Sequence, residues 1–357
     1  MNAISWFTLH KMSNRGFSKK IIQWYEENKR SLPWRDTTDP YKIWLSEIIL
    51  QQTRVAQGLP YYERFVKTFP TVFSLAKASQ QEVLRLWQGL GYYSRARNLH
   101  AGAKMVVEDF DGKFPDSYQE LKKLKGIGPY TAAAIASIAF KESVAVVDGN
   151  VFRVLARIFG IEKDIASNEG KAFFFEKANE LIPKEQPDLF NQAVMEFGAL
   201  HCLPQNPNCD TCVFAKECVA NQHDLQKVLP VKAKKLKVRN RYFYYFVIRH
   251  QNKILMKQRE GKDIWQGLYD FYLVETKRNS KTEVLIKEDI LLKGSTKISD
   301  SKIYKHILSH QKLMVRFVEM ELSSTKIPAS LELKWFTEKQ VAALPKPILI
   351  AKYLIEE

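Results

Sequence analysis

Apolar residues recur every three or four positions from Phe17 to about residue 220, and this spacing predicts a succession of helices. Asp39-Pro40 favours a helix start, whereas the residue before Pro33 is biased away from helix. Because convincing strand patterns are lacking, we expect this half to be all-α. The predicted helices cover residues 21–30, 41–57, 82–91, 92–110, two helices within 117–140, the segment after 147, 171–182 and 190–202.

The pattern changes from Tyr242 onward, where short runs rich in β-branched and aromatic residues alternate with turn residues. These runs predict strands, and residues 344–357 predict a closing helix. We therefore expect a small α+β domain in this half. The predicted strands cover residues 242–250, 253–259, 268–275 and 313–322.

Between the two patterns lies a basic stretch, residues 226–241, that contains a proline and has no apolar period, which is typical of a linker. It divides the chain into a helical domain over 17–225 and an α+β domain over 242–357. Residues 1–16 are expected to be disordered. They hold a short apolar patch but no basic start or cleavage site, so they do not indicate a signal peptide.

The charge balance points to a polyanionic partner. The 357 residues include 55 Lys and Arg against 39 Asp and Glu, a formal net charge of +16. Such an excess favours nucleic acid, with a membrane surface as the second interpretation and a merely solvated basic surface as the third. No long amphipathic helix with a basic face supports the membrane, and no apolar run is long enough to span one.

All cysteines of the chain lie between Cys202 and Cys218, with the spacing C-x6-C-x2-C-x5-C. This clustering predicts a reducing, cytoplasmic compartment and four thiolates that share a metal centre. Zinc and a [4Fe–4S] cluster both suit four thiolates, but the single C-x2-C pair favours the iron–sulfur cluster. Four unliganded cysteines are the remaining alternative. The predicted ligands are Cys202, Cys209, Cys212 and Cys218.

A glycine-rich turn lies between two predicted helices at residues 124–131, with the sequence LKGIGPYT. Gly126 and Gly128 allow a tight turn with exposed N–H groups, and Pro129 suits the first position of a helix. Amides and a helix N-terminus together form an anion site, which a DNA phosphate would fill. Taken alone, the turn is more typical of an ordinary helix–helix connection.

The order of these motifs resembles the helix-hairpin-helix base-excision glycosylases. The hairpin is followed by an aspartate in VVDGNVFR and then by the cysteine motif; SEIILQQT and GLGYYSRARNLH make the chain similar to the adenine-specific branch of that family. The resemblance implies a mainly α glycosylase domain with a [4Fe–4S] loop at 202–218, followed by an α+β Nudix-like domain. It also implies a monomeric, monofunctional enzyme of base excision repair. Its substrate would be duplex DNA, from which it hydrolyses adenine mispaired with 8-oxoguanine or G.

Two carboxylates carry the predicted chemistry, because adenine leaves only if the base is protonated and a positive sugar is stabilised. Glu47 lies among apolar residues, which would raise its pKa and suit a general acid, although it could equally face solvent. Asp148 also fits a simple helix N-cap. The resemblance implies that Glu47 protonates N7 of adenine and then guides water, that Asp148 stabilises the sugar, and that Asn150 supports the site.

Tyr130 stands where related lyases carry the lysine that forms a Schiff base, and a phenol forms no imine. The resemblance also implies further contacts to the extruded base and to the opened duplex, although Trp34 could equally pack in the core. The adenine pocket would comprise Trp34, Arg35 and Gln192, and the DNA contacts would be Gln52, Tyr92, Gly126, Gly128 and Thr131.

The Nudix-like half lacks the acidic box R-E-x-x-E-E-x-G of a hydrolase, since its glutamates are scattered among lysines. We therefore expect a binding module for 8-oxoguanine. Residues 306–310 resemble the family's F-S-H loop with Leu308 in place of Phe, which loses aromatic stacking. Ser309 would hydrogen-bond the lesion beside His310, although a plain turn between strands fits the same residues.

Three other functions remain open at this point. The chain could be a pyrimidine-lesion glycosylase with lyase activity, against which Tyr130 and Glu47 argue. It could be a catalytically silent iron–sulfur protein that binds DNA, although both carboxylates are present. It could also be a nucleotide pyrophosphatase, against which the missing acidic box argues.

Overall fold

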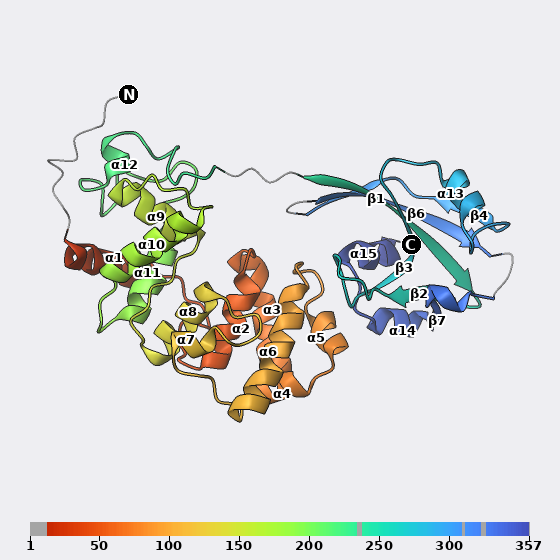
Figure 1. Ribbon diagram of the computed structural model, residues 1–357, viewed down its shortest axis with the longest axis horizontal. Coiled ribbons are helices and arrows are strands. Elements are labelled where there is room, and N and C mark those ends of the chain that lie inside the picture. Colours follow the sequence, from red (N-terminus) through yellow and green to blue (C-terminus); the bar gives the residue numbers. More distant parts are fainter. Residues whose placement is uncertain (1–12, 234–237, 309–310, 323–325, 357) are drawn as a thin grey trace. The chain divides into compact units, whose positions relative to one another are not determined.

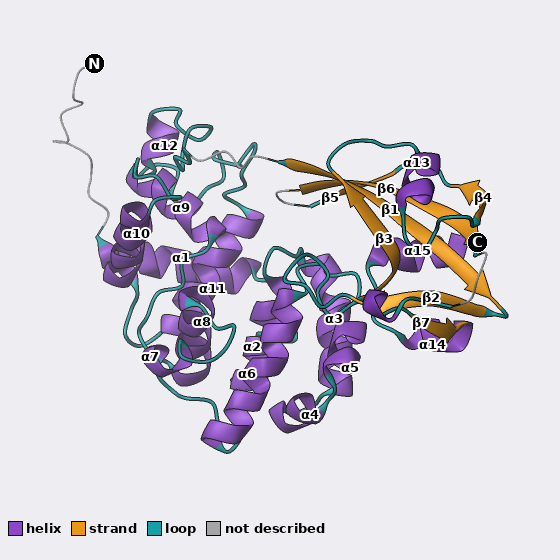
Figure 2. Ribbon diagram, turned by 45° about the vertical axis from the view of Figure 1, so that its right-hand side comes forward, coloured by secondary structure: helices purple, strands orange, loops and turns teal. Residues whose placement is uncertain are grey.

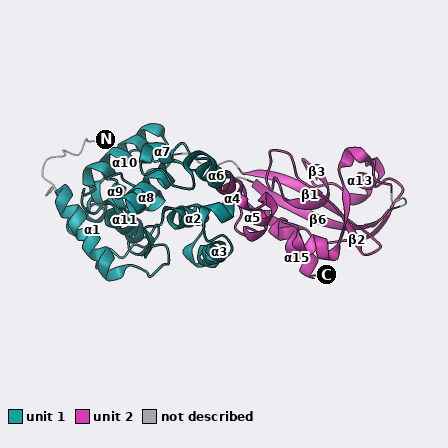
Figure 3. Cartoon of the chain, turned by 90° about the horizontal axis from the view of Figure 1, so that it is seen from below, with its two compact units in different colours: residues 1–76, 101–234 teal, residues 77–100, 235–357 magenta. Residues whose placement is uncertain are grey.

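The computed structural model describes residues 13–233, 238–308, 311–322 and 326–356. The chain divides into two structural units, each with its own internal contacts (Figure 3). Unit 1 comprises residues 1–76 and 101–234, and unit 2 comprises residues 77–100 and 235–357. The segment 77–100 therefore belongs with the C-terminal strands, although its sequence continues the helical pattern.

The described part of unit 1 contains helices and no strand, as its periodicity predicts (Figure 1). No helix in the described ranges of the chain has the length and hydropathy that crossing a membrane requires. The helices are α1 (Asn14–Asn28), α2 (Pro40–Leu50), α3 (Val55–Thr68), α4 (Val72–Lys77), α6 (Ser94–Phe110), α7 (Tyr118–Leu121), α8 (Pro129–Phe140), α9 (Gly149–Phe159), α10 (Asn168–Leu181), α11 (Pro187–Leu200) and α12 (Val219–Gln222), of which α4 ends and α6 begins in the unit 2 segment.

The single helix predicted over residues 41–57 is wrong, because the structure has two helices there. The first, α2, ends at Leu50, and Gln52 adopts a left-handed conformation with φ of 54° before α3 begins at Val55. A non-glycine residue rarely adopts positive φ, and one such residue breaks the helical hydrogen-bond ladder. The sequence at this break contains no glycine or proline that would mark it.

Unit 2 is built on a mixed sheet with the strand order β4-β6-β1-β3-β2-β7, and β5 also pairs with β6 (Figure 2). Strands β1 and β6 are parallel, whereas β1 with β3 and β5 with β6 are antiparallel. The strands are β1 (Arg239–His250), β2 (Lys253–Gln258), β3 (Tyr269–Thr276), β4 (Thr296–Asp300), β5 (Tyr304–Ile307), β6 (Gln311–Glu321) and β7 (Lys334–Thr337).

Strand β1 is buried on both faces, which explains its long aromatic run. On one face Tyr244 belongs to the core cluster that includes Ile286 of α13 (Thr282–Glu288). On the other face Tyr245 stacks on Phe317, whose ring also stacks on Tyr353 of α15 (Ile348–Glu356) at 3.9 Å. The expected α+β domain is thus confirmed. The remaining helices of unit 2 are α5 (Gln80–Leu86), the 3-10 helix η1 (Ala329–Leu331) and α14 (Glu338–Ala343).

Candidate active site

The predicted catalytic residues come from three helices of unit 1. Glu47 lies near the end of α2, Tyr130 is the second residue of α8, and Asp148 precedes α9 as its N-cap. All three line one cavity, together with Asn150 and Gln192. The fold therefore gathers residues that are widely separated in the sequence.

Glu47 is buried, with 8% of its surface exposed, so the solvent-facing alternative is wrong. Burial, with a smaller contribution from the neighbouring carboxylate of Asp148, raises its pKa to about 7. A hydrogen bond with Tyr130 and the charge of Arg35 oppose this shift. A carboxyl with a pKa near neutrality holds its proton part of the time and can transfer it to a bound base.

Asp148 is both a helix cap and a member of the cavity. Its Oδ1 accepts hydrogen bonds from the backbone N–H groups of Asn150 and Val151, each at 2.8 Å, and its Oδ2 accepts one from the Asn150 side chain at 2.8 Å. Burial raises the pKa of Asp148, and these three donors act against that rise. Hydrogen bonds and the N-terminal end of the α9 dipole both favour a negative charge at this carboxylate.

The start of α9 is fixed by contacts that the sequence did not reveal. Arg153 donates from Nη2 to the Asn150 side-chain oxygen at 2.8 Å and to the Gly198 carbonyl at 2.6 Å, and from Nε to the Cys202 carbonyl at 2.8 Å. At Gly198, a Cβ atom would lie 2.6 Å from Cβ of Asn150. Helix α11 can therefore approach α9 this closely only with glycine at that position.

Tyr130 faces the carboxyl group of Glu47 from α8. Its hydroxyl lies 3.6 Å from the Met195 sulfur, and it forms the hydrogen bond with Glu47. Burial and the nearby charge of Glu47 raise the pKa of Tyr130 well above its ordinary value. The phenol therefore keeps its proton at neutral pH, and it can donate to Glu47 but offers no amine.

The three residues predicted for the adenine pocket also line this cavity. Trp34 packs edge-on against Tyr62, with ring centroids 5.1 Å apart. The Gln192 side-chain oxygen accepts a hydrogen bond from the Tyr25 hydroxyl at 3.1 Å. Trp34 is therefore a buried residue that also lines the cavity, and Arg35 lies on the cavity wall.

Glu196 was missed by the sequence analysis, although it lines the cavity one helical turn after Gln192. Arg30 and Arg35 each bind its carboxylate with two side-chain nitrogens, at 2.6 to 2.8 Å. Burial alone would raise its pKa, but these hydrogen bonds lower it to about 2. The signal in the sequence was the spacing of four residues, which places both polar side chains on one face of α11.

The predicted hairpin joins α7 to α8. Gly126 has a φ of 81°, and Gly128 is the N-cap of α8 and has open space where a Cβ would lie. Both glycines are exposed, as is Gln52. Thr131 differs, because its side chain is buried and its hydroxyl lies 3.3 Å from the Gln51 side-chain nitrogen. Any DNA contact of that residue would use its backbone N–H.

Two family models match the chain, that of the HhH-GPD superfamily base excision DNA repair protein over residues 45–183 and that of the NUDIX domain over residues 244–356. The adenine DNA glycosylase of Buchnera aphidicola subsp. Schizaphis graminum (strain Sg) is 34% identical over 337 residues, which cover 93% of this chain and 96% of that protein. The chain belongs to the adenine DNA glycosylase family. This confirms the resemblance found in the sequence, and the chain is a DNA N-glycosylase of base excision repair.

Solved structures also match a large part of this chain. A thermostable thymine-DNA glycosylase is 30% identical with a TM-score of 0.55, and the match covers 59% of this chain and 97% of that one. Endonuclease III in a non-covalent DNA complex is 21% identical with a TM-score of 0.52, over 60% of this chain and 99% of that one. The second likeness shows a shared fold.

The four cysteines of this chain line a second cavity of unit 1, beside α9 and the end of α11. Arg157 donates to the Cys202 sulfur at 3.4 Å, and the Phe214 N–H donates to the Cys212 sulfur at 3.4 Å. Within the described ranges, no three His, Cys, Asp or Glu side chains form a group that could hold a metal ion. The cavity wall carries four cysteine sulfurs, and hydrogen bonds are directed at three of them, the third from the Gln226 side-chain nitrogen to the Cys209 sulfur at 4.0 Å.

In unit 2 of the glycosylase, Tyr92 and Leu308 line one cavity together with Trp265 and His306. Tyr92 has a φ of 46°, and 41% of its surface is exposed. The sequence placed Tyr92 among the DNA contacts and Leu308 in the lesion loop, and the structure brings them to the same cavity. The predicted residues Ser309 and His310 lie outside the described residues.

Proposed function

We propose that the enzyme excises adenine paired with 8-oxoguanine, or with G as a weaker substrate, in duplex DNA. The observation that carries the proposal is a pair of carboxyl groups in one cavity with different surroundings. Glu47 lies in an apolar helix and has a pKa of about 7, whereas Asp148 accepts three N–H groups at a helix N-terminus. Such a pair separates the role of proton donor from that of charge stabiliser.

In the proposed reaction, the adenine leaves the base stack and enters the cavity, since its glycosidic bond is out of reach inside the duplex. Protonated Glu47 gives its proton to N7 of adenine, and the bond between the base and the sugar breaks. The positive charge that develops on the sugar is stabilised by Asp148, which Asn150 holds in place. Glu47, now ionised, orients a water, takes up its proton as the water oxygen bonds to the sugar carbon, and so returns to its protonated form.

The pH dependence of the rate of adenine release should reveal the pKa of the general acid. Because Glu47 acts in its protonated form and has a pKa of about 7, the single-turnover rate of adenine release should be level at low pH and fall as pH rises through 7. Well above that value we expect a loss of about tenfold per pH unit. Rates measured between pH 5.5 and 9 check this; a rate that rises with pH over this range would mean that the critical group acts as a base.

We propose that the enzyme is monofunctional, with hydrolysis and no strand cleavage. Tyr130 supports this, because its protonated phenol occupies the helix start at which a lyase needs an amine. Borohydride trapping on abasic DNA tests the assignment. A covalent protein–DNA adduct formed in high yield would contradict it.

We propose that Cys202, Cys209, Cys212 and Cys218 hold a [4Fe–4S] cluster. The chemistry of the donor set supports this group, since four cysteine sulfurs line one cavity and hydrogen bonds point at three of them. When bound, the cluster would tie the 202–218 loop to the end of α11, which carries Gln192 and Glu196.

Analysis of the anaerobically purified protein tests the cluster. We expect about four iron and four acid-labile sulfide per chain. Cys209→Ser should lose iron together with sulfide, whereas His223→Gln, a matched change outside the thiolate set, should keep both. Stoichiometric zinc without sulfide would contradict the assignment.

For unit 2, we propose recognition of the 8-oxoguanine that pairs with the target adenine. The cavity with Tyr92 and Leu308 supports this, because an exposed aromatic ring and an apolar side chain can replace the stacking that an opened base pair loses. Ser309 would supply the hydrogen bond to the lesion. Binding rather than nucleotide hydrolysis is favoured because Glu275 pairs with Arg241 and Glu283 with Lys297.

A further inference from the structure

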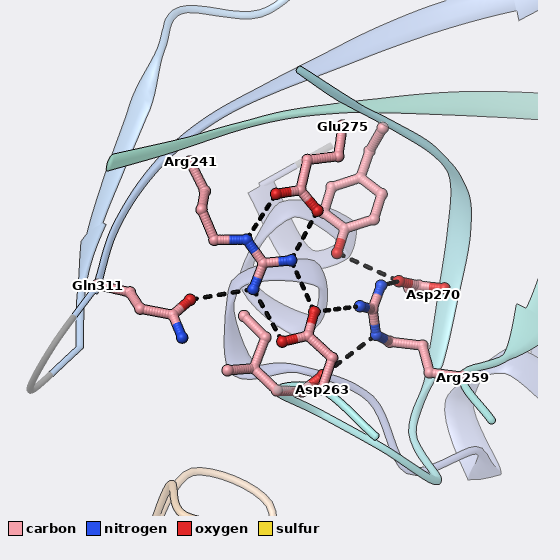
Figure 4. Close-up of polar contacts among 8 residues, drawn as sticks. Arg241, Arg259, Asp263, Asp270, Glu275 and Gln311 are labelled. Carbon is pink, nitrogen blue, oxygen red and sulfur yellow. Dashed lines mark hydrogen bonds and ion pairs between the residues drawn. The ribbon is translucent and has the colours of Figure 1, made fainter. Parts of the chain in front are cut away.

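A buried guanidinium, that of Arg241, lies near the start of β1, at the last position of the predicted basic linker. Arg241 donates from Nε and Nη2 to Glu275, both at 2.6 Å, and from Nη1 and Nη2 to Asp263 at 2.9 and 2.6 Å. Nη1 also donates to the Gln311 side chain at 3.0 Å (Figure 4). These contacts use all five N–H donors of the arginine. The two carboxylates also raise the pKa of Arg241, so it stays charged.

The partners of Arg241 come from three separate segments. Glu275 belongs to β3, Asp263 to the connection between β2 and β3, and Gln311 is the first residue of β6. The Asp263 carboxylate also forms an ion pair with Arg259, and Arg259 pairs in turn with buried Asp270 at 2.7 Å. The linker end, the β2–β3 connection and β6 are therefore joined through one side chain.

The contact with Gln311 acts on the hairpin that β5 and β6 form. The last pair of this ladder is Ile307 with Lys312, and beyond it the Leu308 N–H donates to the Gln311 carbonyl at 2.8 Å. Residues 308 and 311 thus bracket Ser309 and His310, the residues predicted to read the lesion. Arg241 holds the side chain of the residue whose carbonyl closes this hairpin.

Trp265 connects the Arg241 network to β5, the other strand of the hairpin. This residue follows Asp263 by two positions, is buried, and lies 5.8 Å from the His306 ring on β5. Its ring also contacts Phe243, over which the Arg241 guanidinium lies at 4.8 Å. Trp265 and His306 line the cavity that contains Tyr92 and Leu308. Arg241 is therefore connected, directly through Gln311 or indirectly through Phe243 and Trp265, to both strands of the hairpin and to the cavity wall.

We propose that Arg241 is a positioning residue for lesion recognition. Through Asp263 and Gln311 it fixes the position of the β5–β6 hairpin, and that position determines the preference for adenine opposite 8-oxoguanine over adenine opposite G. This rests on the proposed function of unit 2. Lysine cannot replace arginine here, because an ammonium lacks the planar fork that binds two carboxylates at once. Arg241→Lys keeps the charge and removes the geometry, so it isolates the positioning role.

Two variants and one control test this proposal. Arg241→Lys and Asp263→Asn break the network, the latter at its half-exposed edge. Arg249→Gln is the matched control, since it lies at the other end of β1 and pairs with Glu319 at 4.0 Å. The readouts are thermal melting, hydrogen exchange of the peptide that contains the Leu308 amide, and the ratio of single-turnover rates on the two mispairs.

We expect both network variants to speed exchange at the hairpin by about tenfold or more while the other strands of the sheet keep their protection. The rate ratio should fall by about tenfold, because a small displacement of a binding group is costly. The control should match the wild type in both. If Arg241→Lys proves unfolded by melting, Asp263→Asn decides the test.

Two results overturn the proposal, and they are distinguishable. If the wild type prefers 8-oxoguanine but the variants keep its ratio or its hairpin protection, Arg241 is only a structural residue and the function of unit 2 stands. If the wild type itself shows no preference, lesion recognition by unit 2 fails and the inference fails with it.

Discussion

Replacing Glu47 with Gln should lower the single-turnover rate of adenine release by about 10³-fold, the middle of the range for loss of a general acid. Glutamine has nearly the same shape but gives up no proton, so the substrate is bound and the bond to the base persists. The buried site should accept the change without loss of folding, since burial already favours the neutral form of this carboxyl. Adenine release from a duplex with one A:8-oxoguanine pair measures the effect.

The control for this prediction is Glu63→Gln, the same chemical change at an exposed position of α3. It should leave the rate of adenine release unaltered. If Glu47→Gln retained a rate within tenfold of the wild type while Glu63→Gln behaved as expected, another group would have to supply the proton.

Asp148→Asn should lower the same rate by about 10²- to 10³-fold, because it removes the charge that stabilises the developing sugar cation. The substitution separates two roles of this residue. Asparagine is as good an N-cap as aspartate, and its side-chain oxygen can still accept from the N–H groups of Asn150 and Val151. Helix α9 should therefore remain capped, and the melting temperature should stay close to that of the wild type.

If Asp148→Asn kept the wild-type rate and the wild-type stability, the role of Asp148 in stabilising the sugar cation would be contradicted, and the residue would be a helix cap alone. Asp109→Asn, at an exposed position of α6, controls for the loss of one negative charge elsewhere in unit 1. A loss of rate in that variant would point to a general charge effect.

The fold class could be predicted from the sequence because a buried face of a helix or strand spaces the apolar residues with the period of that element. The helical spacing of unit 1 and the strand runs of β1, β2, β3 and β6 each follow from one face or two faces meeting a core. The short strands β4 and β7 did not stand out, since they have few apolar residues and most of their residues are exposed or only partly buried. The break between α2 and α3 was also hidden, because Gln52 carries its positive φ without a glycine.

The candidate site was predictable only in part. The pattern around Glu47 left its burial undecided, because Glu47 lies on a helix that is apolar nearly all round. The anchoring of Glu196 by Arg30 and Arg35 spans more than 160 positions, and the requirement for Gly198 arises only when α11 meets α9. Such contacts depend on how helices pack, which local periodicity does not specify.

Arg241 illustrates the same limit in unit 2. In the sequence it is one more basic residue at the end of a predicted linker, whereas in the structure β1 begins at Arg239 and the side chain of Arg241 is buried between two carboxylates. Neither Asp263 nor Glu275 is near it in the sequence. A basic run can therefore contain a residue whose role is internal.

One measurement tests the central claim most directly. A duplex with a single adenine opposite 8-oxoguanine is treated with excess enzyme, and free adenine and strand breaks are measured in parallel, with and without alkali. The account predicts rapid adenine release at neutral pH and strand breaks that appear only after alkali. Absence of adenine release would contradict the substrate, and strand breaks without alkali at the rate of base release would contradict the monofunctional mechanism.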